Sequence, residues 1–275
     1  MLNKVLNSNE YKNDKILFTI VNLILTSDSL EYYTDGENYL ICRSNPNTPI
    51  WVWNKDNINE DIVNEILIKL DSMLDEEKVI QITSKEVIFN KLMERYEDIV
   101  VDNYFIQKGN YLQMKAYECK NLIKPKNMIG HKERPTYDDL ELLAYFQKCD
   151  VEDTLREEYA KKVTQTQLLE TAKRHIDTSN FYVWKVDGRI VATAGYIDNR
   201  ISMVFTNRED RGHGYAGMLC YELCEDVIKQ GKIPVLYADA DYIPSNRAYQ
   251  KIGFEEVGSL YNVKIGKAKM KEMKR

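Results

Sequence analysis

Three glycines lie within the seven residues RGHGYAG at positions 211–217. This stretch follows an apolar run at residues 201–206 and leads into residues 216–228, where apolar or small side chains recur in steps of three and four. That spacing predicts an amphipathic helix with one wide buried stripe, which Gly231 is placed to end. Because glycines let backbone amides turn inward at the start of a helix, the loop is also a candidate anion site.

An antiparallel meander is predicted before this loop. Residues 181–186 and 189–197 are apolar runs joined by Asp187-Gly188, which is a strong hairpin signal. Residues 201–206 supply the third strand. A strand, a short helix and two closing strands are predicted to follow, at residues 233–238, 245–252, 254–257 and 261–265. This order predicts an α/β fold with one mixed sheet.

A chain of 275 residues suits two modest domains. The pattern lapses at residues 121–125, so a linker is predicted there, between an N-terminal α/β domain (1–124) and a second domain (125–275) that contains the whole sheet.

The first half ends in a predicted strand, a helix and a hairpin, the last between residues 104–106 and 111–117. This order resembles that of residues 233–265. It favours a decayed copy of the same fold, although no comparable glycine-rich loop is present. Trp51 and Trp53 are either core residues of this half or the lining of a pocket.

Composition argues against several classes of protein. The 38 basic and 43 acidic residues are mixed along the chain and give a net charge of −5, so nucleic-acid binding is not predicted. Three histidines and five cysteines without zinc-site spacing predict no metal centre. The apolar stretch at residues 16–25 is shorter than the roughly 20 residues of a membrane span. We therefore expect a soluble, cytoplasmic monomer or homodimer with no membrane partner.

The glycine-rich loop also fits the dinucleotide-binding pattern GxGxxG through Gly212, Gly214 and Gly217, with Asp239 at the end of the next strand. Several charged or polar residues precede Gly212, the preceding strands form a meander, and too few residues follow Asp239 to complete a doubly wound sheet. These features disfavour a dinucleotide. A tight turn without any ligand stays open.

The same loop resembles the acyl-CoA signature of the GNAT superfamily of N-acyltransferases, which is Arg or Gln, two residues, Gly, one residue, then Gly or Ala. Here these positions are Arg211, Gly214 and Ala216. Downstream, the stretch SNRAYQKIGF (245–254) resembles the second signature of the family, with Asn246, Tyr249 and a closing Gly-Phe. The resemblance covers about residues 126–275.

This resemblance implies a GNAT fold in the second half and transfer of an acyl group, most simply acetyl from acetyl-CoA, to the primary amine of a small molecule. It implies that residues 201–206 splay from residues 233–238, that the pantetheine arm lies between these strands, and that the loop amides hold the pyrophosphate. The implied donor-binding residues are Val204, Phe205, Thr206, Arg211, Gly212, His213, Gly214, Tyr215, Ala216, Asn246 and Tyr249.

Tyr249 is the implied general acid, and the alternative is a core tyrosine. No carboxylate lies on residues 201–206, where many relatives carry the base, so Asp239 is the tentative base. Asp241 is a second candidate, and solvation of the loop is an alternative role for both. Asp198 and His175 are weaker candidates. Two other functions stay open: a catalytically silent acyl-CoA-binding or regulatory module, and acetylation of a protein amine.

Overall fold

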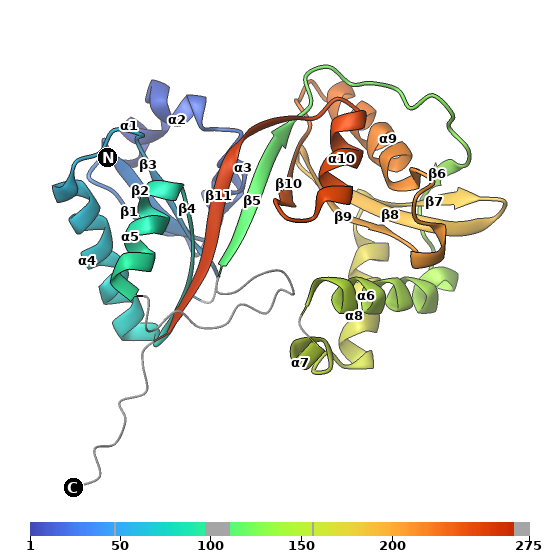
Figure 1. Cartoon of the computed structure of the whole chain (residues 1–275), viewed down its shortest axis with the longest axis horizontal. Coiled ribbons are helices and arrows are strands. Elements are labelled where there is room, and N and C mark those ends of the chain that lie inside the picture. Colours follow the sequence, from blue (N-terminus) through green and yellow to red (C-terminus); the bar gives the residue numbers. More distant parts are fainter. Residues whose placement is uncertain (47, 97–110, 156, 267–275) are drawn as a thin grey trace, which may run out of the picture. The chain divides into compact units, whose positions relative to one another are not determined.

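The computed structural model describes residues 1–46, 48–96, 111–155 and 157–266 (Figure 1). These residues form two compact units. Unit 1 contains residues 1–96, 111–115 and 258–266, and unit 2 contains residues 116–257. The predicted strand at residues 104–106 lies outside the described residues.

The units differ from the predicted domains in two places. Residues 116–124 fall in unit 2, and residues 258–266 fall in unit 1. The irregular stretch predicted as a linker packs within unit 2, where the Ile123 N–H donates to the Ile252 carbonyl (3.0 Å). Two strands, β5 (Tyr111–Glu118) and β11 (Glu255–Gly266), each have residues in both units.

Unit 2 contains the predicted meander. Strands β6 (His131–Glu133), β7 (Phe181–Val186), β8 (Arg189–Ile197) and β9 (Arg200–Thr206) pair antiparallel in chain order. Strand β10 (Val235–Asp239) lies parallel to β9. The prediction of a mixed sheet is therefore confirmed.

The turn between β7 and β8 has the backbone conformation that its sequence, Asp187-Gly188, predicts. Asp187 and Gly188 both have positive φ, at 50° and 76°. A two-residue hairpin turn whose twist matches that of the strands needs this backbone conformation, which Asp and Gly adopt most readily.

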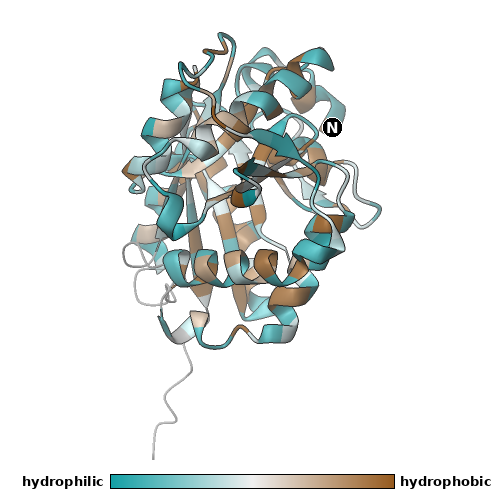
Figure 2. Cartoon of the chain, turned by 90° about the vertical axis from the view of Figure 1, so that its right-hand side faces the viewer, coloured by the Kyte–Doolittle hydropathy of each residue, from teal (hydrophilic) through white to brown (hydrophobic). Residues whose placement is uncertain are grey.

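The helices of unit 2 cover the two faces of this sheet. On one face, α6 (Leu140–Thr154) and α8 (Gln165–Asp177) bury a cluster that includes Phe205 of β9. On the other face, α9 (Tyr215–Lys229) buries a cluster that includes Ile201 of β9. Figure 2 shows both brown and teal residues along the surface helices, as expected for amphipathic helices. The shorter helices are η2 (Tyr137–Asp139), α7 (Glu157–Ala160), η3 (Arg208–Asp210) and α10 (Ile243–Lys251).

Unit 1 has its own core. Strands β1 (Glu31–Tyr33), β2 (Tyr39–Arg43) and β3 (Ile50–Asn54) are antiparallel, and β4 (Val79–Ser84) is parallel to β3. Its helices are α1 (Leu2–Leu6), α2 (Asn9–Asn13), α3 (Thr19–Ile24), α4 (Glu60–Glu77) and α5 (Glu86–Tyr96). Trp51 and Trp53 are buried in this unit, so they are core residues.

The same order of elements occurs twice along the chain. In the first half, β1, β2 and β3 are followed by α4, β4, α5 and β5; in the second, β7, β8 and β9 are followed by α9, β10, α10 and β11. In both, a helix connects the third strand to a parallel fourth strand. This duplication supports the interpretation of the first half as a copy of the second.

The last strand is where the sequence-based assignment is wrong. Residues 254–257 and 261–265 were assigned to two strands, whereas β11 runs without a break from Glu255 to Gly266. Gly258 and Ser259 interrupt the apolar pattern but do not end the strand. From residue 261 to 266, β11 pairs antiparallel with β4 in unit 1.

This arrangement predicts that a fragment of residues 124–275 is poorly stable. Tyr117 and Cys119 are buried in the core of unit 2 and would be missing from it. Loss of a buried aromatic side chain alone typically costs about 3–5 kcal/mol. We expect fragment 124–275 to unfold at a clearly lower urea concentration, followed by circular dichroism, than fragment 112–275, which carries the same residues 258–275. Equal midpoints would contradict the placement of residues 116–124 in unit 2.

Candidate functional site

Strands β9 and β10 are joined at only one end. They pair at a single register position, Arg200 with Val235, and the Val235 N–H donates to the Asn199 carbonyl (3.0 Å). Among the described residues, β9 and β10 have no further pair. The β10-facing edge of β9 beyond Arg200 therefore presents backbone N–H and C=O groups without a strand partner, a situation that favours an extended ligand.

A bulge interrupts the other edge of β9. Thr193 and Gly195 of β8 pair with Phe205 and Ser202, so β9 has one residue more than β8 across this interval. Met203 lies in the bulge and has a φ of 56°. Bulges re-aim backbone and side chains and occur often beside active sites. No local residue pattern predicts the bulge at Met203, because Met has no preference for positive φ.

The glycine-rich loop depends on glycine for its backbone conformation. Gly212 and Gly214 have φ of 85° and 80°, which other residues rarely adopt. A Cβ atom at Gly212 would meet nothing within 4 Å, and one at Gly214 would meet only the Met218 Cε at 4.0 Å. The space above both glycines is therefore open.

The start of α9 fits an anion. Gly214 is its N-cap, no side chain caps the helix, and no acidic residue lies in the first turn. The first intrahelical bond runs from the Met218 N–H to the Gly214 carbonyl (3.0 Å). The amides of Tyr215, Ala216 and Gly217 have no acceptor in the described part of the chain. Unpaired N–H groups and the helix dipole together suit a diphosphate.

The corresponding helix of unit 1 lacks these properties. The Asn59 side chain caps α4 by accepting from the Ile62 N–H (3.0 Å), and Glu60 and Asp61 occupy its first turn. A capped and negatively charged helix start repels an anion. Of these two helices, α9 therefore has the start that suits an anion.

Two arginines fasten the loop to α6. Arg208 and Arg211 both form ion pairs with Asp153, and Arg211 Nε also donates to the Thr206 carbonyl (3.2 Å). Burial raises the pKa of Asp153, but the hydrogen bonds from Arg208 and Arg211 outweigh it and lower that pKa overall. The Arg211 guanidinium lies over the Phe205 ring, 5.6 Å from its centroid. Arg211 thus holds the loop in place through its side chain, and the Asp153 contact carries no local sequence signal.

A second set of contacts shapes the loop from inside. Asp210 is buried and accepts from Arg189 Nη2 (3.1 Å) and Asn207 Nδ2 (2.6 Å). The His213 ring stacks on Tyr215, with centroids 5.4 Å apart and an interplanar angle of 11°. These contacts lie away from the open space found at the Cβ positions of Gly212 and Gly214.

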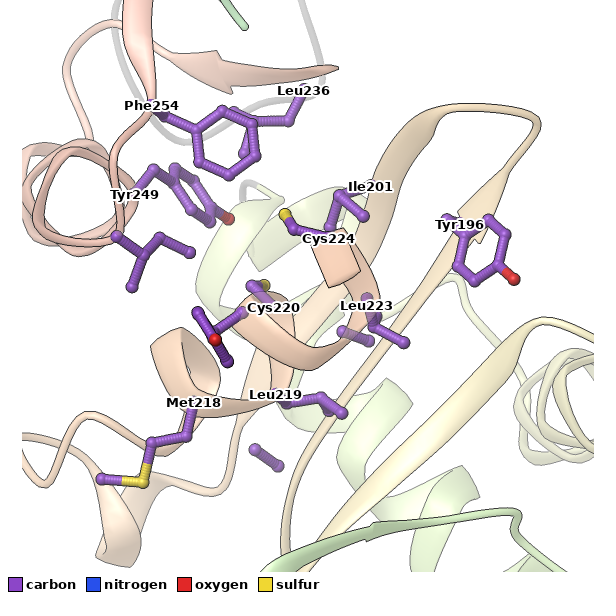
Figure 3. Packing of buried hydrophobic residues seen from close by; sticks show 14 of the residues in the cluster. Tyr196, Ile201, Met218, Leu219, Cys220, Leu223, Cys224, Leu236, Tyr249 and Phe254 are labelled. Carbon is purple, nitrogen blue, oxygen red and sulfur yellow. The ribbon is translucent and has the colours of Figure 1, made fainter. Parts of the chain in front are cut away.

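Tyr249 lies in the core cluster below α9. It is 8% exposed and packs edge-on against Phe254, with ring centroids 6.1 Å apart. Figure 3 shows it with Cys220, Cys224 and Phe254. Burial, reinforced by Cys220, raises the pKa of Tyr249 far above its ordinary value. The phenol therefore stays protonated, which is the state that a proton donor needs. The ring of Tyr249 is part of the core.

The side-chain amide of Asn246 forms hydrogen bonds with other groups of the protein. Its Nδ2 donates to the carbonyls of Asp239 (2.7 Å) and Tyr242 (3.0 Å), and its Oδ1 accepts from the Tyr117 hydroxyl (2.8 Å). These bonds hold the end of β10 against α10 and do not cap the helix N–H groups. A direct contact between Asn246 and the donor stays a prediction.

The candidate bases have structural contacts of their own. Asp239 Oδ1 accepts from the Asp241 N–H (2.8 Å), as in a turn. Asp198 pairs with Lys232, and His175 stacks on Phe181 with burial lowering the pKa of its imidazole. The role of Asp239 as a base stays a prediction.

In the described ranges, no group of three or more His, Cys, Asp or Glu side chains is arranged to hold a metal ion. No described helix has both the length and the apolar character needed to cross a membrane. A hollow of about 440 Å³ beside α6, lined among others by Tyr145, Lys185 and Arg189, contains none of the predicted site residues.

Comparison with known proteins gives the fold. A family model described as FR47-like protein matches residues 189–263. An acetyltransferase of the GNAT family from Colwellia psychrerythraea superposes with a TM-score of 0.52 at 13% identity, over 85% of this chain and 83% of that one. For a GCN5-related N-acetyltransferase from Kribbella flavida the TM-score is 0.57 at 11% identity, over 94% and 97% of the two chains. The chain has the GNAT fold. A search of curated proteins gave no match.

The GNAT fold of this chain brings the predicted residues to one part of unit 2. The superpositions extend over both units, while the FR47-like match includes β8, β9, α9, β10 and α10. The end of β9 contains Val204, Phe205 and Thr206, and α10 contains Asn246 and Tyr249. The loop between β9 and α9 contains Arg211, Gly212, His213 and Gly214. The helix α9 then begins with Tyr215 and Ala216.

Proposed function

We propose that the protein is an acyl-CoA-dependent N-acetyltransferase that moves the acetyl group of acetyl-CoA to the primary amine of a small molecule. One observation carries this proposal: an uncapped helix start, entered through two left-handed glycines, comes next in the chain after a strand that pairs with β10 at a single position. The GNAT fold of the chain is consistent with this activity.

The residues of this site match the parts of acetyl-CoA. The amides of residues 212–217 suit the pyrophosphate, and the open Cβ positions of Gly212 and Gly214 leave room for it. The unpaired edge at Val204 and Thr206 suits the amides of the pantetheine arm. Holding the thioester in one place lets an amine attack it with the advantage of an intramolecular reaction.

The proposed reaction balances without any further reactant. The amine nitrogen attacks the thioester carbonyl carbon, a C–N bond forms and the C–S bond breaks. Tyr249 donates its proton to the departing sulfur, and the proton of the amine passes to Asp239 or to water. Because the thiolate of CoA is a fair leaving group, Tyr249 assists the reaction and is not indispensable.

Calorimetry and thiol release test this function together. We expect the protein to bind acetyl-CoA and not to bind NAD, since the loop follows a meander and not a βαβ unit. With a broad panel of small amines, we expect release of free CoA thiol. Binding without turnover on every amine would support the silent module, and turnover only on peptide amines would support a protein acetyltransferase. No binding of acetyl-CoA would refute the proposal.

A further inference from the structure

Two buried polar atoms on β9 have no hydrogen-bond partner among the described residues. They are Arg200 Nε and Ser202 Oγ, two residues apart on the same strand. Arg200 forms no ion pair with any described residue, and the phenol of Tyr237 offsets only part of the effect of burial on its guanidinium. Burial lowers the pKa of this guanidinium. Arg200 is partly exposed and its Nε is buried, and a guanidinium held there without a counterion is costly, so its presence calls for an explanation.

The alternation of β9 shows which face these atoms occupy. Ile201, between them, belongs to the cluster under α9. Since successive side chains of a strand point to opposite faces, Arg200 and Ser202 point to the face that α6 and α8 cover. The predicted donor site at the start of α9 and this polar pair therefore lie on different sides of β9.

Strand β10 shows the same alternation. Leu236 and Ala238 pack against the cluster under α9, so Tyr237 and Asp239 point to the other face. Asp239 lies four positions after Val235, the partner of Arg200, which is about 13 Å along the strand. The sheet face that α6 and α8 cover thus carries the Arg200 guanidinium at one end of the β9–β10 pair and the candidate base Asp239 farther along β10.

We propose that Arg200 and Ser202 bind a carboxylate of the acceptor, so that the acceptor class is amines that also carry an acidic group. This inference rests on the proposed function, because it assigns the second substrate of the same site. The guanidinium fork matches a carboxylate, and Ser202 supplies a further donor. The acidic group would neutralise Arg200, while Asp239 faces the end of the molecule that carries the amine.

Binding to matched pairs of amines tests the proposal without requiring turnover. Each pair differs by one carboxylate: lysine and cadaverine, tyrosine and tyramine, tryptophan and tryptamine, 4-aminobutyrate and propylamine. Calorimetry with and without saturating CoA should show that the acidic member of at least one pair binds about tenfold or more tightly, as for a charged hydrogen bond. Arg200→Gln should remove this preference, and Arg200→Lys should keep part of it.

Two controls separate binding from folding. Arg174→Gln removes an exposed arginine of the same unit, whose guanidinium donates to the Thr171 hydroxyl, and should keep the preference. Arg200→Gln should melt at the same temperature as the wild type or higher, because it removes a partly buried charge that has no described counterion. A merely structural Arg200 predicts the opposite, namely a lower melting temperature and an unchanged preference.

The outcomes distinguish this inference from the proposed function. If no acidic amine is preferred by the wild type, or if the preference survives in Arg200→Gln, the carboxylate site is wrong. Turnover confined to amines without an acidic group would overturn it while leaving the transferase intact. Preferred binding of acidic amines without any binding of acetyl-CoA would support the carboxylate site and refute the transferase.

Discussion

Replacing Gly214 with glutamate is expected to abolish binding of acetyl-CoA. Gly214 has a φ of 80° at the start of α9, where the amides of residues 215–217 lack acceptors. A side chain there would fill the open space above the loop, and its carboxylate would take the position proposed for the pyrophosphate. Titration of the folded variant with acetyl-CoA in a calorimeter should give no binding heat.

Gly231→Glu is the matched control for this variant. Gly231 lies just after the end of the same helix, has a φ of 74°, and a Cβ atom there would meet nothing within 4 Å. Both substitutions impose similar left-handed strain, about 1–2 kcal/mol for a residue other than glycine. The control should therefore lose similar stability and still bind acetyl-CoA. Normal affinity in Gly214→Glu, or equal loss in both variants, would show that the loop does not hold the donor.

The features that sequence predicted correctly are local ones. Asp187-Gly188 forms the predicted hairpin because both residues adopt positive φ easily. The stripe at residues 216–228 forms α9, which ends at Lys229, just before Gly231. Each of these depends on residues within a few positions of one another, so a single segment contains the information.

The features that the sequence does not predict depend on contacts between distant segments. The bond between Asp153 and Arg211 joins α6 to the loop across 58 positions. The pairing of β11 with β4 and the burial of Tyr117 beside Asn246 are equally remote in sequence. The unpaired state of Arg200 is likewise visible only once all of its neighbours are in place. Register and partner choice follow from how whole elements pack, and periodicity within one element does not specify them.

Tyr249→Phe is expected to lower turnover by about 100-fold, the lower end of what a positioned general acid contributes. The variant keeps the ring that packs on Phe254 and removes only the hydroxyl, so affinity for acetyl-CoA should change little. Steady-state thiol release at saturating acetyl-CoA, together with calorimetry on the same preparation, measures both quantities.

The matched control is Tyr196→Phe, which removes a hydroxyl from the same core cluster. Tyr196 is 6% exposed, against 8% for Tyr249, and its hydroxyl accepts only from Gln230 Nε2 (3.2 Å). Figure 3 shows both tyrosines in the cluster. This control should lose some stability and keep its turnover. If instead Tyr249→Phe melts at a lower temperature with full turnover per folded molecule, Tyr249 is a core residue without a role in proton transfer.

The pH dependence gives an independent check on the same residue. Burial raises the pKa of Tyr249 above the ordinary value of about 10, so the phenol remains protonated throughout the neutral and mildly alkaline range. Between pH 8 and about pH 10, turnover of the wild type and of the Tyr249→Phe variant should therefore change with pH in the same way. The ratio of the two rates should stay constant across this interval. A ratio that falls toward one as the pH approaches 10 would mean that Tyr249 loses its proton in that range, and a buried, protonated acid at this position would be excluded.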